Sequence, residues 1–306
     1  MIIRRGLNAV APQPEFSRRS QAVSSFLHFL VPYRFSLLAA IVFPLTAIGY
    51  WIGRKRLAAD GAEAPGPWRT FGFYLGLVSC YVVLHTRFDY YGQFVFFMHR
   101  AQHLVLHHLG ALLIALGRPA VVLGAALPAT FPRHAWPFRV LYRGVRIIQQ
   151  PFIASAVFVG LIAFWLIPSI HFAAMLSQPL YLLMNWSMLI DGVLFWLVLV
   201  DPRPPETSPM PGYGVRFMMV FGTMITQVLL GSFITFTHRS LYSIYSVCGR
   251  ALPISPARDQ VVGGLLTWIP PAMMEAIVML IVLSLMMNYE KHRSTVTPAG
   301  AYAVAG

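Results

Sequence analysis

The chain has 306 residues, of which 57% are hydrophobic and only 11% are charged. An ordinary soluble domain is about 45–50% apolar and about 25% charged, so this composition excludes a disordered chain and argues against a soluble enzyme. The two cysteines, Cys80 and Cys248, lie far apart, which excludes a disulfide scaffold, an iron–sulfur cluster and a thiolate metal site. The composition predicts an all-α, polytopic membrane protein.

The chain is predicted to consist of a basic N-terminal arm, a membrane domain and a short tail. The arm covers residues 1–34, and its segment 21–33 is suited to the membrane interface. Seven runs within residues 35–290 reach the length of about 20 mainly apolar residues that a membrane helix needs. These runs lie near 35–53, 68–86, 91–117, 151–170, 178–200, 213–237 and 262–288. Residues 118–150 mix arginines with aromatic residues and are interpreted as an amphipathic surface stretch, and 291–306 as a flexible tail.

The net charge of +13 comes almost entirely from arginines that lie between the apolar runs. Arginines in such positions set membrane topology more often than they bind nucleic acid, so no nucleic-acid partner is expected. Seven spans place the termini on opposite sides of the membrane, which we call side A (the side of the N-terminus) and side B. Because lysine and arginine are more frequent on side B, the N-terminus is predicted outside and the C-terminus in the cytoplasm.

Histidines gather toward side A. Four predicted spans bring five of them there, namely His85, His99, His103, His171 and His238. His99, His103 and His107 follow one another at intervals of four residues, which predicts a row along one face of the third span. Because imidazole suits copper, zinc, iron and nickel, this row predicts a metal site. The alternative is that the rings only form hydrogen bonds between helices.

Methionine is frequent in the chain, with 14 residues. Met184 and Met188 are among those that fall toward side A. Thioethers are soft ligands that favour Cu(I), but methionine also fills gaps between packed helices, and both interpretations stay open.

Two acidic residues interrupt apolar runs, Asp191 in the fifth span and Glu275 in the seventh. A carboxylate in hydrocarbon costs several kcal/mol unless it is paired or protonated. One interpretation is a relay for protons or metal. The other is an interhelical hydrogen bond, or a pair with Arg100 or His108.

Four motifs occur in order along the chain. The first is His99-Arg100-Ala101-Gln102-His103, followed by Leu116-Gly117-Arg118-Pro119. The second is Gly192-Val193-Leu194-Phe195-Trp196, and the third joins Leu230-Gly231-Ser232 to Leu241-Tyr242-Ser243-Ile244-Tyr245. The last is Asp259-Gln260-Val261-Val262-Gly263-Gly264 with Trp268-Ile269-Pro270. Together they resemble the motifs of the CtaG-type assembly factors of bacterial cytochrome c oxidases.

The resemblance implies a seven-helix bundle in the bacterial plasma membrane that helps to mature a haem–copper oxidase, by binding or delivering copper. The implied partners, besides membrane lipid, are cytochrome c oxidase subunits or another copper-containing membrane complex. We expect copper at His99 and His103, with His107, His85, His171 or His238 as further ligands. Asp259 and Gln260 are expected to position a partner or a ligand.

The chain departs from the family pattern at two places. Arg100 stands where methionine is usual, which removes a soft ligand and adds a charge. Many members carry a Glu-His pair before the second motif, where this chain has the stretch Met184-Asn185-Trp186-Ser187-Met188. These departures indicate a divergent subgroup with altered use of metal.

Other roles fit the same residues. A copper transporter would use Asp191, His108 and Glu275 as inner steps, and a redox subunit would hold b-type haem between histidines on neighbouring helices. A structural subunit would use its histidines only for packing. Nucleotide-binding and hydrolase motifs are absent from the sequence, so no enzymatic activity is expected. Gly263-Gly264 permits close helix packing and leaves an oligomer open.

Overall fold

The computed structural model describes residues 31, 34–128, 130–132, 135–203 and 210–296, and their regular structure is entirely helical. Apart from Val31, the predicted interfacial segment 21–33 lies outside the described residues. In chain order the helices are α2 (Leu37–Ala59), α3 (Pro67–His85), α4 (Arg87–Phe94), α5 (Phe96–His103), the π-helix η1 (Leu104–Leu109), α6 (Gly110–Leu116), α7 (Pro119–Ala126), α8 (Trp136–Ile148), α9 (Pro151–Leu166), α10 (Pro168–Leu176), α11 (Gln178–Leu199), α12 (Tyr213–Phe236), α13 (Ile244–Val247) and α14 (Pro256–Val296).

The helices have the length and composition of membrane spans. Four of them, α2, α11, α12 and α14, are each long and apolar enough to cross a membrane alone. Three bent pairs pass the same test: α3 with α4 at 59°, α5–α6 with α7 at 63°, and α8 with α9 at 82°. The described residues therefore hold up to seven spans, which confirms an all-α, multi-pass membrane protein.

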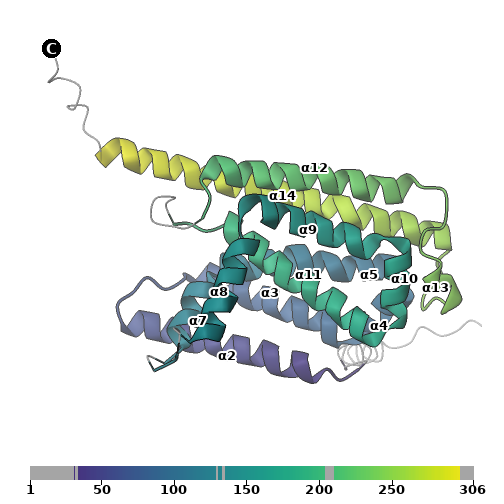
Figure 1. Cartoon of the computed structure of the whole chain (residues 1–306), viewed down its shortest axis with the longest axis horizontal. Helices are drawn as coiled ribbons and strands as arrows, with labels where there is room; N and C mark the ends of the chain where they lie inside the picture. The colour runs from purple at the N-terminus through teal and green to yellow at the C-terminus, as the bar shows by residue number, and fades with distance from the viewer. Residues whose placement is uncertain (1–30, 32–33, 129, 133–134, 204–209, 297–306) are drawn as a thin grey trace, which may run out of the picture.

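The long helices run side by side in one bundle (Figure 1). α12 and α14 pack along each other on one flank, and α2 lies on the opposite flank (Figure 1). The helix formed by α5, η1 and α6 contacts α3, α11 and α14. α14 has 41 residues, or about 60 Å at 1.5 Å per residue, twice the apolar thickness of a bilayer. It continues past residue 290, where the predicted membrane domain ends, and projects beyond the bundle (Figure 1).

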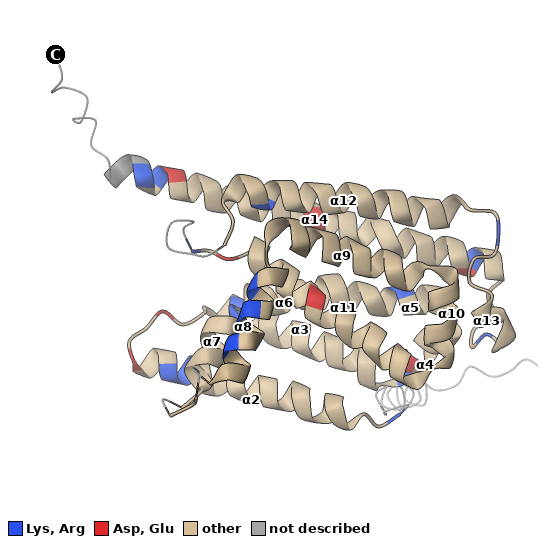
Figure 2. Cartoon of the chain, viewed as in Figure 1, with Lys and Arg blue, Asp and Glu red and all other residues tan. Residues whose placement is uncertain are grey.

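Charged residues gather toward the two ends of the bundle (Figure 2). The end with α4, α10 and α13 corresponds to side A, and the end with α7 and α8 corresponds to side B. Three charged residues between the ends are buried within the bundle, Arg100 on α5, Asp191 on α11 and Glu275 on α14. Buried ionisable groups in a membrane bundle are costly, so their surroundings are the natural place to look for function.

Local sequence signals explain where several helices begin. Proline stands in the first turn, where the missing N–H costs nothing, at Pro67, Pro119, Pro151 and Pro168. Thr86 Oγ1 accepts a hydrogen bond from the N–H of Phe88 at 3.2 Å and so caps α4 at its bend from α3. The predicted surface stretch 118–150 contains α7 and α8, and α8 buries none of its residues.

Two adjacent glycines bring α14 close to its neighbours. A Cβ on Gly263 would lie 2.3 Å from the Phe96 ring of α5, and one on Gly264 would lie 2.5 Å from Thr235 Oγ1 of α12. Both glycines thus serve close packing within the chain. The oligomer that the sequence left open stays a prediction.

Candidate functional site: a buried histidine cluster near side A

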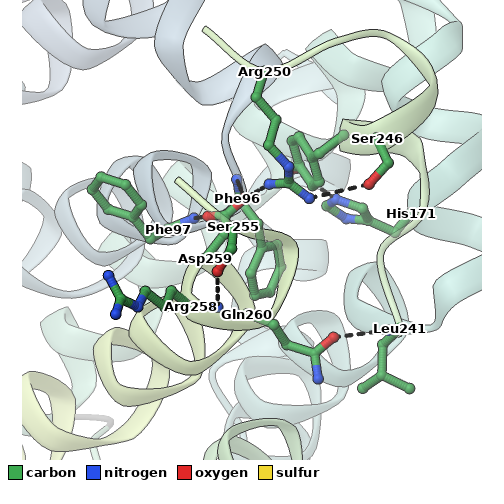
Figure 3. A network of polar contacts seen from close by, with 11 residues as sticks. Phe96, Phe97, His171, Leu241, Ser246, Arg250, Ser255, Arg258, Asp259 and Gln260 are labelled. Atoms are coloured by element: carbon green, nitrogen blue, oxygen red, sulfur yellow. Dashed lines mark hydrogen bonds and ion pairs between the residues drawn. The ribbon is translucent and has the colours of Figure 1, made fainter. Parts of the chain in front are cut away.

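The N-terminus of α5 rests on the first turn of α14 (Figure 3). Asp259 accepts two backbone hydrogen bonds there, from the N–H of Phe96 at 3.1 Å and from the N–H of Phe97 at 2.8 Å. Arg250, in the segment before α14, forms an ion pair with the same carboxylate. A carboxylate at a helix N-terminus satisfies free N–H groups and complements the helix dipole. Asp259 therefore fixes the position from which α5 presents its histidines.

The neighbouring Gln260 holds the segment that joins α12 to α14 (Figure 3). Its Oε1 accepts the N–H of Leu241 at 2.8 Å. Its Nε2 donates to the carbonyls of Thr237 at 3.0 Å and Arg239 at 2.9 Å. Asp259 and Gln260 thus anchor backbone segments at side A. Their expected role toward a partner or a metal ligand stays a prediction.

Three histidines from two helices meet inside the bundle, and we call His99, His103 and His171 the outer cluster. The ring centroids of His99 and His103 lie 4.3 Å apart, and those of His99 and His171 lie 5.1 Å apart. All three side chains are at most 1% exposed. Neither ring nitrogen of His99 makes a well-formed hydrogen bond, although both are buried and the ring lies beside the Gly92 backbone. A buried polar atom without a partner is costly and calls for an explanation.

The other two rings of the outer cluster have partners at both nitrogens. Nδ1 of His171 lies 3.1 Å from the carbonyl oxygen of Trp165, so Nδ1 carries the proton and Nε2 keeps the lone pair. That Nε2 accepts the hydroxyl of Tyr245 at 2.9 Å. Burial raises the pKa of the Tyr245 phenol well above its ordinary value, so the hydroxyl is present as a donor. His103 Nε2 lies 3.1 Å from Asn185 Oδ1.

The buried guanidinium of Arg100 adjoins the outer cluster. It is 4% exposed and lies 3.3 Å from Nδ1 of His103 through NH1. Its Nε donates to Thr267 Oγ1 on α14 at 3.0 Å. Because guanidinium has only donors, His103 Nδ1 accepts this hydrogen bond and its Nε2–H donates to Asn185. His103 and His171 therefore each have one ring nitrogen with a lone pair that could bind a metal. In this structure those lone pairs accept hydrogen bonds from Arg100 and Tyr245, respectively.

The helix that carries the predicted row of histidines changes to the π-helix η1 at Leu104, between His103 and His107. His107 and His108, which we call the inner pair, face other partners. His107 Nε2 lies 3.0 Å from Asp191 Oδ2, and His108 Nε2 lies 3.1 Å from Gln227 Oε1. Asp191 is therefore paired with His107, and not with Arg100 or His108 as one interpretation of the sequence had it.

The backbone of η1 is also bound by α11. Trp196 Nε1 donates to the carbonyl of His107 at 2.9 Å. A Cβ on Gly192 would lie 2.5 Å from the same carbonyl oxygen, so only glycine permits this approach. Both residues belong to the Gly192–Trp196 motif, which thus holds the π-helix in place.

The remaining candidates lie apart from the outer cluster. His85 is buried at the end of α3, where its ring contacts Tyr81 and Phe35, and His238 is exposed after α12. Met184 and Met188 are fully buried and belong to the apolar core that includes Phe96 and Tyr181. Glu275 is fully buried, and its carboxyl oxygens make no well-formed hydrogen bond, although the side chain of Thr223 lies close to them.

The ring nitrogens of the outer cluster are suitable ligands for copper. In the present geometry, however, they are not arranged to bind one ion together. Three imidazoles are ligands of a type that copper accepts. No three His, Cys, Asp or Glu side chains in the described part of the chain are arranged to hold a metal as they stand. Binding would require the rings of His103 and His171 to exchange Arg100 and Tyr245 for the metal. His99 makes no well-formed hydrogen bond at either nitrogen.

A family model described as cytochrome c oxidase caa3 assembly factor (Caa3_CtaG) matches residues 48–288. The chain belongs to this family. The match extends from within α2 to near the end of α14 and includes the whole outer cluster. No curated protein and no solved structure matches the chain. The resemblance inferred from the four motifs is therefore confirmed for the family of oxidase assembly factors.

Several residues around the cluster of this assembly factor were not found from the sequence. Tyr245 lies in the third motif, which gave no hint that its hydroxyl would bind His171. Asn185 stood out only as a departure from the family pattern. Asp89 carried no signal, yet its Oδ1 accepts hydrogen bonds from Tyr181 at 2.7 Å and Gln102 at 2.9 Å. This network holds α4, α5 and α11 together beside His99.

Proposed function

We propose that this chain is a non-enzymatic assembly factor. Its outer cluster binds copper that is in transit to the oxidase. The observation that carries the proposal is His99, a fully buried imidazole that makes no well-formed hydrogen bond at either nitrogen and has only the Gly92 backbone beside it as a polar contact of this kind. Two further imidazoles lie within 5.1 Å of it, measured between ring centroids. A buried ring of this kind is explained if a ligand binds to one of its nitrogens.

The partners of His103 and His171 suit a site that binds its cargo for a time only. Copper binding displaces the Tyr245 hydroxyl from His171 and the Arg100 guanidinium from His103. Both donors stay within reach and can take the lone pairs back when copper leaves. His171 would ligate through Nε2 while its Nδ1–H stays on the Trp165 carbonyl, an arrangement that orients many metal-bound histidines.

The proposal is tested by titrating the purified full-length chain with Cu(I) against a competing chelator. We expect one copper per chain, with a loss of at least about tenfold in affinity in His99→Ala and in His171→Ala. His85→Ala and His238→Ala are matched controls, because these histidines lie apart from the outer cluster, and their affinity should equal the wild type. Equal losses in all four variants, or no binding by the wild type, would contradict the proposal.

The proposal includes an orientation in the bacterial plasma membrane, with side A outside. Arginine-rich segments on side B support it through the positive-inside rule. The chain carries its own reporter, because Cys248 on side A is exposed and Cys80 is buried. A membrane-impermeant maleimide should label intact cells at Cys248 and should leave Cys248→Ser unlabelled. If Cys248 is labelled only after the cells are lysed, side A faces the cytoplasm and the proposed orientation is wrong.

The expected partners are subunits of cytochrome c oxidase or of another copper-containing membrane complex. Family membership supports an association with the oxidase, and the outer cluster supports copper as the cargo. Affinity purification from cells, with His99→Ala as a comparison, tests whether oxidase subunits accompany the chain. Copper transport and haem binding stay predictions from the sequence, to be tested by metal uptake into proteoliposomes and by an absorption spectrum.

A further inference from the structure

A separate cavity opens at side B, far along the bundle from the outer cluster. It has a volume of about 440 Å³, within the range of roughly 300–1,000 Å³ that small-molecule sites occupy. Residues of α6, α7, α8 and α11 and of the segment after α11 line it. We call it the side-B cavity.

The lining of the side-B cavity has an apolar part and a basic part. Its wall is apolar and is formed by Ala115, Ala120, Val121, Val145, Leu194, Leu197, Val200 and Met210. Three guanidinium groups lie on the remaining part, those of Arg118, Arg146 and Arg203. Asp201 is the single carboxylate in the lining, and it already forms an ion pair with Arg203. The cavity thus combines an apolar wall with a net positive charge, which suits an amphiphile with an anionic head.

Arg118 holds an unusual backbone conformation that places it at this site. Its φ is 54°, in the left-handed region, and it is the only non-glycine residue with positive φ among the described residues. Such strain persists where the surrounding structure determines it, and it clusters at functional sites. Arg118 also lines a second hollow of about 390 Å³ together with Arg69 and Arg203. It forms an ion pair with Glu63, whose side chain is 87% exposed, so this partner is easily exchanged.

The position of the cavity favours a membrane lipid over a soluble anion. α8, which supplies Tyr142, Val145 and Arg146 to the lining, buries none of its residues. Its exposed side chains include Trp136, the type of residue that sits at the level of lipid headgroups. Basic pockets between membrane helices on the cytoplasmic side are suited to anionic headgroups.

We propose that the side-B cavity binds the phosphate group of an anionic membrane phospholipid. Arg118 and Arg146 donate to the phosphate oxygens, and the apolar wall contacts the beginning of the acyl chains. This site is independent of the copper proposal, because none of its residues belongs to the outer cluster.

The test is native mass spectrometry of the full-length chain, titrated with phosphatidylglycerol or with phosphatidylcholine. We expect one phosphatidylglycerol per chain, bound at least about tenfold more tightly than phosphatidylcholine. Arg118→Gln combined with Arg146→Gln should remove this preference. Arg139→Gln combined with Arg143→Gln is the matched control, because it removes the same charge from exposed positions on α8 outside the cavity, and it should retain the preference.

Two further arms keep the test decisive. Ala120→Trp fills the apolar wall without a change of charge and should also abolish the bound lipid, even if the double arginine variant fails to fold. Inorganic phosphate in excess should leave the bound lipid in place. Equal loss of lipid in the control variant, retention in Ala120→Trp, or displacement by phosphate alone would each overturn the proposal.

Discussion

The outer cluster and the inner pair lie on one continuous helix and differ in how their rings are satisfied. Each ring of the inner pair has an acceptor for Nε2 on a neighbouring helix, Asp191 for His107 and Gln227 for His108, whereas its Nδ1 is buried without a hydrogen-bond partner. In the outer cluster, His103 and His171 have an acceptor at one nitrogen and a donor at the other. His99 makes no well-formed hydrogen bond at either nitrogen.

The inner pair lies on the π-helix η1, directly after α5. His107 has its partner on α11, as His103 does, and His108 has its partner on α12. The inner pair ties these helices together, and the proposal places the cargo at the outer cluster, where three rings meet. The predictions below separate these two roles, beginning with the largest expected effect.

The largest effect is expected when the outer cluster is removed. His99→Ala combined with His103→Ala should lower cellular oxidase activity to the level of cells that lack the chain, because no copper is delivered. The measurement is oxidase activity and copper content in membranes. His85→Ala combined with His238→Ala should behave as wild type. If the first variant supports normal oxidase activity, the outer cluster has no part in copper delivery.

Removal of an acceptor from the inner pair should affect stability and not metal. Asp191→Leu leaves the buried Nε2 of His107 without its partner, which costs about 1–3 kcal/mol of unfolding free energy. Asp191→Asn keeps an acceptor at the same place and should cost less. Unfolding in detergent measures the stability, and the Cu(I) titration should give the wild-type affinity for both variants. A loss of copper in Asp191→Asn would assign the inner pair to the metal site.

The charge beside the outer cluster should limit its affinity for copper. Arg100→Met removes a positive charge next to His103 Nδ1 and supplies a thioether, so Cu(I) affinity should rise by about tenfold or more. Arg100→Lys retains the charge and should show no such rise. A decrease in affinity in Arg100→Met would show that the guanidinium supports the site.

The smallest effect is expected from a change in packing behind the outer cluster. A Cβ on Gly263 would lie 2.3 Å from the ring of Phe96, which contacts His171 at 6.1 Å between ring centroids. Gly263→Ala should therefore lower stability by about 1 kcal/mol and weaken copper binding a few-fold. Gly222→Ala on α12 is the control, because a Cβ there meets no atom within 4 Å. If the two variants have the same stability and the same affinity for copper, the packing of Gly263 does not support the outer cluster.

The hydrophobic runs predicted the helical fold well, because the thickness of the bilayer's apolar core sets the number of apolar residues that a membrane helix needs. The seven predicted runs correspond to helices from α2 to α14. The breaks within the bent pairs coincide with local features such as the Thr86 cap and Pro119, which mark helix starts without giving an angle. The 63° bend at Arg118 depends on a left-handed residue that no pattern in the sequence indicates.

The site was predicted in part. Sidedness alone placed His99, His103 and His171 near one face, and the structure brings these three together. His107 follows in η1 and has its partner Asp191 on α11, the helix that also carries Asn185, the partner of His103. Its expected role as a ligand stays a prediction. Partners such as Tyr245 come from segments far along the chain, and only the packed structure shows which of them reach a given ring.

Copper K-edge absorption spectroscopy of the Cu(I)-loaded, full-length chain tests the central proposal most directly. We predict a copper site dominated by imidazole nitrogen, with the imidazole scattering reduced in His99→Ala and in His171→Ala and unchanged in His107→Ala. A spectrum that is the same in wild type and His99→Ala would contradict the assignment of copper to the outer cluster.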